Sequence, residues 1–519
     1  DKGSSSAKST SAASAANDTV DEDGKVNGIM YQEGLPLVDE GAYTFSIFCD
    51  DSSESGEFIM LDEFKKQTNV DVDLKIYPYE TATERLNLDL NSGDYADVIG
   101  GWTLSDNAIL TYGVNQGVFI PLEDYFEKYC PNISAILDLP GVREKMTAPD
   151  GHIYTIPYVC ADSTVGYSPY INTKWLENVG MSMPTTTDEF EAVLKAFKEQ
   201  DANGNGDASD EIPFSTDPNN KHIEAMAGYF GLPMNKLGIA IQNEKVVYGG
   251  VSDTYREFLS WFHKLYAEGL VDVELYTQDS STWEGKGNQD LYGVSIAYGS
   301  GEFTGIPAAE ERGDFDSMPV LNTDKDGIWL RDTEGFSVYR TQAVITNKAE
   351  HPEIICRWFD NAFALENGIG CNRGPVGVIV NKEDDGYHAI DTTTLSEEDQ
   401  EKYSWGNLWP QSLPKYLPAD FEFVEEHPMY DEKKATEEAY EANLTKEIIP
   451  SYWIDLDKID TFSDTNTAIK DFFEQQQAQF VCGELDIDND ADWQAYVDGM
   501  YSLGLEDWVA TQGIEEIAK

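Results

Sequence analysis

One short stretch of the chain, residues 201–213, has the residue types and spacing of a loop that could bind a metal ion. Oxygen-bearing side chains recur at every second position around Gly206, which favours a tight turn. Ca²⁺ accepts about six to eight oxygen ligands in irregular geometry, so a short loop can surround it. The stretch matches the EF-hand pattern through Gly206 but has Ile212 at the closing Glu position. The predicted ligands are Asp201, Asn203, Asn205, the backbone carbonyl of Asp207, and Asp210 or Glu211.

The residues before this loop predict how it is held. Residues 188–200 have the periodicity of an amphipathic helix, whose apolar face carries Phe190, Val193, Leu194 and Phe197. A single helix that leads into a single loop indicates a structural calcium clip rather than a paired calcium sensor. The simpler alternative is a solvated Asn/Gly turn that binds nothing.

The charge of the chain excludes one class of partner. Its 519 residues contain 96 Asp and Glu against 35 Lys and Arg, a formal net charge of −61. Nucleic-acid binding needs clusters of basic residues that neutralise phosphates, and the sequence contains no such cluster. No apolar run approaches the ~18 residues of a membrane-spanning helix. The length exceeds what one hydrophobic core normally serves, so we expect two or more domains.

The first 25 residues predict a disordered tether. They are rich in Ser, Ala and Gly, then acidic, and no aromatic residue precedes Tyr31. Such a segment cannot bury enough apolar surface to offset the entropy of ordering. The sequence has no starting Met and no hydrophobic signal region, which suggests a processed, secreted form. An ordinary disordered terminus is the alternative.

From Tyr43 onward the pattern is that of an α/β protein. Strand-like alternation at residues 43–49, 70–76 and 97–99 is separated by helical periodicity at residues 57–68 and 82–91. Strands that alternate with helices predict a mostly parallel sheet with helices packed against it. Further α/β segments follow at 291–297, 335–346 and 352–363, and helical, acidic segments at 425–444, 466–480 and 493–503.

Five local motifs, in this order, resemble those of the bacterial extracellular solute-binding proteins of family 1. The first is the stretch ERLNLDLNSGDYADVI at 84–99, although Ala96 stands where the family usually has Pro. The others are GVNQGVFIPL at 113–122, GHIYTIP at 151–157 followed by 167–180, the loop at 201–213, and the C-terminal segment at 493–504. The chain is most similar to the large group that includes alginate-oligosaccharide-binding proteins and LplA-type lipoproteins.

The resemblance implies a two-lobed, periplasmic-binding-protein-like α/β fold of the class II type, with the ligand cleft between the lobes. It places residues 26–165 and about 335–400 in an N-terminal lobe. The C-terminal lobe is then 166–334 with about 401–519, including the calcium loop and the terminal helices. As a function it implies the extracellular, monomeric substrate-binding component of an ABC transporter. That component captures an oligosaccharide by lobe closure and delivers it to permease subunits. A lipidated Cys before Asp1 would anchor it to the bacterial membrane.

A sugar cleft needs flat aromatic side chains for the apolar sugar faces and polar groups for the hydroxyls. Trp102 follows a predicted strand directly, in a segment that also contains Asp106, and ligands of α/β sheets bind beyond the carboxyl ends of strands. We therefore predict that both residues contact the ligand, although a core position for Trp102 is the alternative.

Loop tryptophans give further candidates. Trp405 and Trp409 lie in a segment punctuated by Gly and Pro, where a binding surface and a capped hydrophobic loop are both open from the residues alone. The resemblance to alginate-binding proteins, which use aromatic side chains from this part of the chain, implies binding. Trp283, Trp329 and Arg373 are weaker candidates, and for Arg373 a structural ion pair is the alternative. Tryptophans on the apolar faces of predicted helices are assigned to the core: Trp261, Trp358, Trp493 and Trp508.

Two other functions fit the sequence less well. A secreted glycoside hydrolase needs two carboxylates that flank the scissile bond, and 96 acidic residues leave room for such a pair. The sequence has neither an HExxH motif nor a P-loop, and Ser300 lacks the first Gly of a nucleophile elbow. A solute-binding protein for peptides or other small solutes is the second alternative, because this fold holds many ligands.

Overall fold

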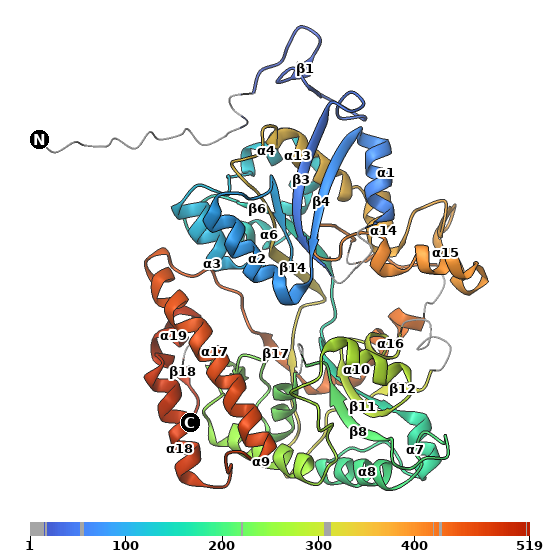
Figure 1. Cartoon of the computed structure of the whole chain (residues 1–519), viewed down its shortest axis with the longest axis vertical. Helices are drawn as coiled ribbons and strands as arrows, with labels where there is room; N and C mark the ends of the chain where they lie inside the picture. The colour runs from blue at the N-terminus through green and yellow to red at the C-terminus, as the bar shows by residue number, and fades with distance from the viewer. Residues whose placement is uncertain are drawn as a thin grey trace, which may run out of the picture. The chain divides into compact units, whose positions relative to one another are not determined.

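In the computed structural model the chain forms two compact units (Figure 1). The structure describes residues 15, 18–51, 57–218, 222–305, 313–418, 420–424, 428–514 and 516–519, apart from the side chains of 80 and 428–431. Unit 1 consists of Asp1–Ala161, Phe336–Glu425 and Trp453–Ile459. Unit 2 consists of Asp162–Gly335, Glu426–Tyr452 and Asp460–Lys519. Each unit is therefore assembled from three separate stretches of sequence.

Two details of the predicted organisation are wrong. Residues 401–425 and 453–459 belong to unit 1 and not to the second lobe, because Trp409 and Leu413 pack into the core of unit 1. The predicted tether ends earlier than residue 25. Residues 18–31 are ordered, since Val26 and Met30 lie in the same core and Lys25 pairs with Tyr31. The prediction for residues 1–14, 16 and 17 lies outside the described residues.

The sheet of unit 1 has five strands in the order β4-β3-β5-β14-β6 (Figure 1). Strands β4, β3 and β5 are parallel, and β14 runs antiparallel to both β5 and β6. Two helices make the crossovers, and each ends at a left-handed residue, Asn69 after α1 and Gly93 after α2. The strands are β3 (Tyr43–Asp50), β4 (Val70–Tyr77), β5 (Val98–Gly100), β6 (Thr155–Ala161) and β14 (Phe336–Ile345).

Helices of unit 1 cover this sheet and bury an aromatic cluster. Trp358 packs edge-on against Phe45 and Phe64 and stacks on Trp409 at 5.7 Å. The helices are α1 (Ile59–Thr68), α2 (Tyr79–Ser92), α3 (Asp106–Ala108), η2 (Ile109–Asn115), α4 (Glu123–Tyr129), α5 (Pro131–Leu137), α6 (Val142–Met146), α13 (Pro352–Ala362), α14 (Leu365–Arg373), η4 (Thr392–Thr394), α15 (Glu397–Lys402), η5 (Trp405–Asn407) and η7 (Leu456–Lys458). Two short hairpins are β1 (Lys25–Val26) with β2 (Met30–Tyr31), and β15 (Val380–Glu383) with β16 (Gly386–Ala389).

Unit 2 is built on a four-stranded sheet in the order β12-β7-β11-β8. Strand β11 is buried along its whole length and pairs antiparallel with β7 and parallel with β8. The strands are β7 (Ser168–Asn172), β8 (Ile212–Thr216), β11 (Tyr292–Ala297) and β12 (Phe315–Ser317). Smaller sheets are formed by β9 (Ile239–Gln242), β10 (Lys245–Tyr248) and β18 (Glu516–Ile517), and by β13 (Trp329–Arg331) with β17 (Leu444–Ile448).

The helices of unit 2 share one large core with the C-terminal helices. Phe473, Phe480 and Trp508 from the C-terminal helices pack with Phe258 and Phe262 of α9. The helices are α7 (Thr173–Val179), α8 (Thr187–Glu199), η3 (Ile223–Phe230), α9 (Asp253–Ala267), α10 (Ser280–Asn288), α11 (Gly301–Thr304), α16 (Pro428–Tyr440), η6 (Glu441–Asn443), α17 (Ile459–Cys482), α18 (Asp490–Ser502) and α19 (Leu505–Thr511).

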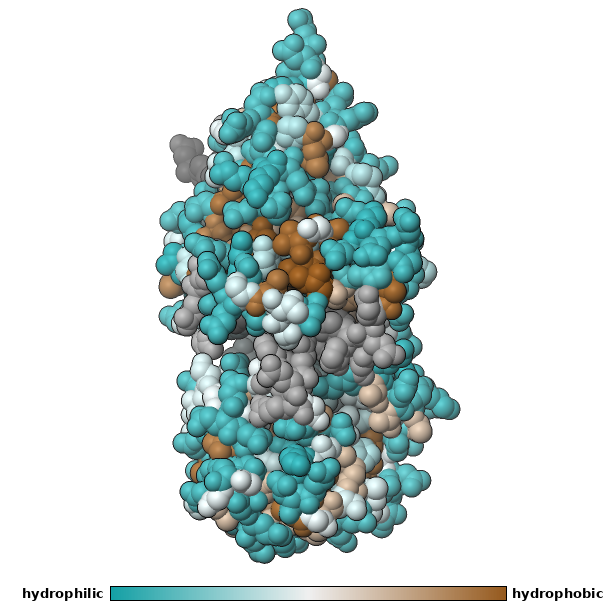
Figure 2. Space-filling view, turned by 90° about the vertical axis from the view of Figure 1, so that its right-hand side faces the viewer, coloured by the Kyte–Doolittle hydropathy of each residue, from teal (hydrophilic) through white to brown (hydrophobic). Residues whose placement is uncertain are grey.

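Most of the face drawn in Figure 2 is hydrophilic. Within the described ranges, no helix is both long and apolar enough to cross a lipid bilayer.

Candidate functional site

Unit 1 carries a partly exposed group of aromatic side chains at the ends of its central strands. Trp102, just after β5, is 45% exposed. Its ring lies edge-on to Tyr339 of β14 at 5.2 Å and to Tyr158 of β6 at 6.3 Å. The two tyrosines stack on each other at 5.5 Å. Trp102 is therefore where the sequence predicted it, beyond the carboxyl end of a strand, and its exposure is consistent with ligand binding. We call Trp102, Tyr158, Tyr339 and Trp405 the aromatic surface.

A buried carboxylate fixes the turn that presents Trp102. The Asp50 carboxylate accepts hydrogen bonds from the backbone N–H of Trp102 at 3.0 Å and of Thr103 at 2.6 Å. Gly101 has φ +131°, and a Cβ there would lie 2.3 Å from Asp50 Oδ1. Burial raises the pKa of Asp50, while the hydrogen bonds from Thr103 and Trp102 act in the opposite direction. The turn therefore needs both the glycine and the carboxylate.

Trp405 reaches the same region from a distant part of the sequence. The segment from Trp405 to Lys415 crosses the ends of the strands, because Gln411 N–H donates to Asp51 at 2.7 Å and Ser412 Oγ donates to the carbonyl of Asp50. Gln411 Nε2 also donates to the carbonyl of Trp405 at 2.9 Å. Trp405 is 46% exposed, as expected for a binding residue.

Lys415 lies beneath the aromatic surface and was not identified from the sequence. Its Nζ is 5.4 Å from the ring centre of Tyr158 and 5.5 Å from that of Trp405. It donates to Gln411 Oε1 at 2.5 Å. Nothing in the local sequence distinguishes this lysine from a surface lysine, because its burial comes from segments far away in the chain.

The two charged residues of unit 1 that were predicted to bind the ligand, Asp106 and Arg373, have structural partners. Arg340 donates to both carboxylate oxygens of Asp106, from Nε at 2.9 Å and from Nη2, and its guanidinium stacks 4.2 Å above Trp453. Asp106 is thus an ion-pair partner at the start of α3. Arg373, the last residue of α14, donates to the carbonyl of Asn372 at 3.2 Å. Its positive charge lies close enough to act on Tyr158 and Lys415.

Three predicted ligand-binding tryptophans are instead core residues, and we correct those predictions. Trp409 has no exposed surface and packs against Phe64 and Trp358. Trp329 is equally buried, between Tyr229 and Tyr440. In both cases the loop or strand that carries the tryptophan is covered by helices distant in sequence. Neither side chain can reach a ligand without unfolding its surroundings.

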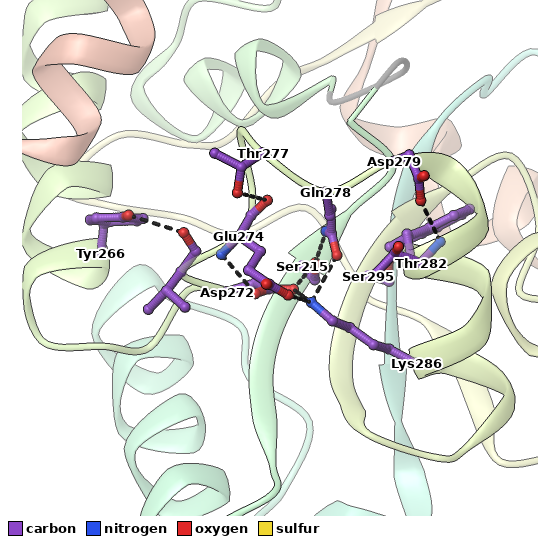
Figure 3. Close-up of polar contacts among 12 residues, drawn as sticks. Ser215, Tyr266, Asp272, Glu274, Thr277, Gln278, Asp279, Thr282, Lys286 and Ser295 are labelled. Atoms are coloured by element: carbon purple, nitrogen blue, oxygen red, sulfur yellow. Dashed lines mark hydrogen bonds and ion pairs between the residues drawn. The ribbon is translucent and has the colours of Figure 1, made fainter.

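Trp283 is buried, and Figure 3 shows Lys286 of the same helix, α10, beside Asp272 and Glu274. The Trp283 Nε1–H donates to Ser295 Oγ of β11 at 3.1 Å. Lys286, one turn further on, forms ion pairs with Asp272 at 3.0 Å and Glu274 at 2.7 Å. These contacts leave Trp283 on the core side of α10.

Unit 2 has its own aromatic group, which the sequence did not reveal. Tyr167 and His222 stack with ring centres 4.0 Å apart, and Tyr298 lies edge-on to Tyr167 at 6.1 Å. Burial lowers the pKa of His222 to about 3, so the ring is neutral at pH 7. Its Nε2 is buried without a hydrogen-bond partner among the described residues. Tyr167, His222 and Tyr298 are each partly exposed as residues.

Helix α16 holds the loops that carry these rings. Lys433 Nζ donates to the carbonyls of Gly166 and Tyr298, each at 2.6 Å. Glu437 accepts from Thr164 N–H at 2.9 Å, and Glu432 accepts from Ser300 N–H at 2.7 Å. Three side chains of one helix thus fix the backbone just before Tyr167 and just after Tyr298.

The predicted metal loop connects α8 to β8. Gly206 N–H donates to Asp201 Oδ2 at 2.9 Å, and the amides of Asn203 and Asn205 donate to Asp210 at 3.2 and 2.7 Å. Glu211 Oε1 accepts from Ala202 N–H at 2.8 Å, and burial raises the pKa of Glu211. Asp201 Oδ1 and Glu211 Oε2 are buried and have no hydrogen-bond partner within the part of the chain that the structure describes. Two unpartnered buried carboxylate oxygens in one loop are what a bound cation would satisfy.

Known proteins resemble the chain over much of its length. It is 33% identical over 335 residues to the fructooligosaccharide ABC transporter substrate-binding protein FusA of Streptococcus pneumoniae serotype 4. The matched region covers 62% of this chain and 61% of FusA. Lipoprotein LipO of Bacillus subtilis is 28% identical over 280 residues, 52% of each chain. The matched region thus spans less than two thirds of either relative.

The similarity to solved structures covers more of the chain. FusA of S. pneumoniae in complex with kestose matches with a TM-score of 0.78 and 26% identity, over 90% of this chain and 98% of FusA. Alginate-binding protein AlgQ2, solved without calcium ion, shares the fold with a TM-score of 0.76 and 22% identity, over 93% and 99% of the two chains. The sequence profile described as "Bacterial extracellular solute-binding protein" matches residues 52–368. The two-lobed α/β fold is confirmed, and the chain belongs to the bacterial extracellular solute-binding protein family.

Proposed function

We propose that this protein captures an oligosaccharide outside the cell as the substrate-binding component of an ABC transporter. The observation that carries the proposal is the aromatic surface of unit 1. Trp102 and Trp405 are large, rigid and nearly half exposed, yet buried polar groups fix the segments that carry them. Exposed tryptophans on a fixed support are suited to the apolar faces of sugar rings, because ordering them costs little entropy.

The aromatic group of unit 2 supports the same function. Tyr167 and Tyr298 are partly exposed aromatic side chains suited to stacking on a sugar, and the neighbouring His222 ring is neutral. We propose that Trp102 and Trp405 are the sugar contacts of unit 1, and that Tyr167 and Tyr298 are the candidate sugar contacts of unit 2. Asp106 and Arg373 then act through their neighbours, in place of the direct contacts we first predicted.

FusA gives the first ligand class to test. That relative is named for fructooligosaccharides, and its structure contains kestose. We therefore propose a short neutral oligosaccharide, with kestose as the first candidate. The strongly negative net charge favours a neutral ligand over a uronate.

We also propose that the 201–211 loop binds Ca²⁺. Asp201, Asn203, Asn205, the carbonyl of Asp207, Asp210 and Glu211 would be the ligands, and the two unpartnered carboxylate oxygens support this assignment. A bound Ca²⁺ would supply fixed positive charge between α8 and β8. It would stabilise unit 2 without contacting the sugar.

The cellular setting is part of the same proposal. We propose a monomer held at the bacterial cell surface by a lipid anchor that precedes Asp1, where it delivers the sugar to permease subunits. LipO, a named lipoprotein, and the extracellular family support this placement.

Isothermal titration calorimetry against kestose, nystose and an unrelated neutral oligosaccharide tests the function, followed by chromatography of the recovered sugar. We expect saturable binding of one class and recovery of intact sugar. Shortened products would instead favour the glycoside hydrolase alternative, which the substrate-binding relatives argue against. Binding of peptides but of no sugar would contradict the proposal.

A further inference from the structure

A lysine with almost no solvent access supports the aromatic surface of unit 1. Lys415 is 1% exposed, and its Nζ lies about equally far from the ring centres of Tyr158 and Trp405, at 5.4 and 5.5 Å. A cation at this distance from two aromatic faces is attracted to both. The ammonium group therefore joins a ring from β6 to a ring from the 405–415 segment.

Lys415 also acts on Trp405 through the backbone. It donates to Gln411 Oε1 at 2.5 Å, and Gln411 Nε2 donates to the carbonyls of Trp405 and Trp409, both at 2.9 Å. Because one Gln411 oxygen is held by Lys415, its amide group is oriented toward these carbonyls. Trp405 is thus held twice, at its ring and at its backbone.

Burying this ammonium group is costly, and the surrounding charges compensate for it only in part. The charged and titratable groups that act on it are Asp51 after β3, Cys160 of β6, and Cys371 and Arg373 of α14. Among the described residues, no carboxylate lies within ion-pair distance of Lys415. Burial lowers the pKa of Lys415 to about 8. A methionine would fill the same space at lower cost, so stability alone does not explain a lysine here.

We propose that Lys415 is a positioning residue for ligand binding, whose charge fixes the orientation of Trp405 and Tyr158 in the aromatic surface. This inference rests on the proposed function and extends it to a group that does not touch the ligand. It follows that affinity decreases when the ammonium loses its proton, because the attraction to both rings is lost.

The test compares Lys415→Met with Lys348→Met. Lys348 is an exposed lysine of unit 1 that lies 5.4 Å above the ring of Tyr95, away from the aromatic surface, so its variant controls for loss of a cation–aromatic contact elsewhere. Calorimetry with kestose at pH 6.5 to 9.5 gives the affinity. We expect Lys415→Met to bind about tenfold more weakly at pH 7. Lys348→Met should bind like the wild type.

The pH profile separates positioning from a general structural role. Wild-type affinity should decrease as pH rises through about 8. Lys415→Met should show no such step, and Lys415→Arg should keep part of the affinity without the step. Equal affinity of Lys415→Met and wild type, or the same step in both, would overturn the inference.

A measurement without ligand keeps the two proposals separate. If the wild type binds no oligosaccharide, the proposed function fails, but the emission of Trp405 still reports on Lys415. The measurement uses the Trp102→Phe background. Between pH 7 and 9, we expect the tryptophan emission to change less in the variant that also carries Lys415→Met than in the variant that keeps Lys415. An identical emission change in both would refute the role of Lys415 independently of any sugar.

Discussion

At the scale of single residues, exposure separates two tryptophans that look alike in sequence. Trp405 and Trp409 lie four positions apart, yet one is 46% exposed and the other fully buried. Helical periodicity correctly assigned Trp358, Trp493 and Trp508 to the core, because it reports on the face of a local element. A loop tryptophan carries no such signal, since its burial depends on segments far away in the chain. Trp409 lies in such a loop. Trp283 and Trp329 lie in a short helix and a three-residue strand, which are too short for periodicity to report on their burial.

This distinction predicts opposite outcomes for two alanine substitutions. Trp102→Ala should weaken oligosaccharide binding by about tenfold or more, because a stacking face is lost. Its free energy of unfolding should hardly change. Trp409→Ala should lower the free energy of unfolding by about 3–5 kcal/mol, because it leaves a cavity between Phe64 and Trp358. Urea denaturation and calorimetry measure both quantities. A large loss of stability in Trp102→Ala would contradict its assignment to the surface.

Lys415 also makes stability depend on pH. Its folded pKa of about 8 lies below its ordinary value of 10.5, so between these values the unfolded chain binds more protons than the folded one. The contribution of Lys415 to stability must therefore rise as pH increases from about 8 to 10.5. We expect Lys415→Met to be more stable than the wild type at pH 7 and to lose that advantage by pH 10. Urea midpoints across this range measure the difference. A constant difference would mean that Lys415 titrates normally.

At the scale of elements, the predicted metal loop is positioned by helix α8 before it and strand β8 after it. The apolar face of α8 was predicted correctly, as Phe190, Val193, Leu194 and Phe197 are all buried. The loop pattern predicts a set of ligand oxygens, because that signal is local, and this set stays a prediction. The unpartnered oxygens of Asp201 and Glu211 became visible only in three dimensions.

Removal of Ca²⁺ tests this loop. EGTA should lower the melting temperature of the wild type by several degrees, because a cation that binds only the folded state stabilises it. Asp201→Ala should remove most of the EGTA effect. Asp207→Ala is the matched control, because Asp207 is predicted to bind the metal through its backbone carbonyl, which the substitution keeps. The Asp207 carboxylate instead accepts a hydrogen bond from Ser209 Oγ at 2.5 Å. If EGTA shifts Asp201→Ala as much as the wild type, the metal lies elsewhere or is absent.

At the scale of the whole molecule, alternating strands and helices predicted the α/β fold, and five ordered motifs indicated the family. The assignment of 401–425 failed because nothing local shows which lobe a connecting segment joins. Asp50 and Lys415 could not have been found either, since their roles arise from contacts with residues more than fifty positions away or from complete burial.

Lobe closure is the prediction that belongs to this scale. A saturating oligosaccharide should reduce the radius of gyration in small-angle X-ray scattering, because the predicted lobe closure makes the molecule more compact. Trp102→Ala at the same sugar concentration should show a smaller change. An unchanged radius in the wild type at saturation would exclude capture by closure.

The position of β14 has a consequence for how the chain is made. This strand lies between β5 and β6, although it follows β6 by more than 170 residues. A growing chain that has not yet reached Phe336 leaves β5 and β6 with unpaired edges and no partner between them. Such long-range pairing slows folding, and exposed edges invite association with other chains. The sheet of unit 1 can therefore be completed only after the chain has been made beyond β14, so this sheet must assemble late in synthesis.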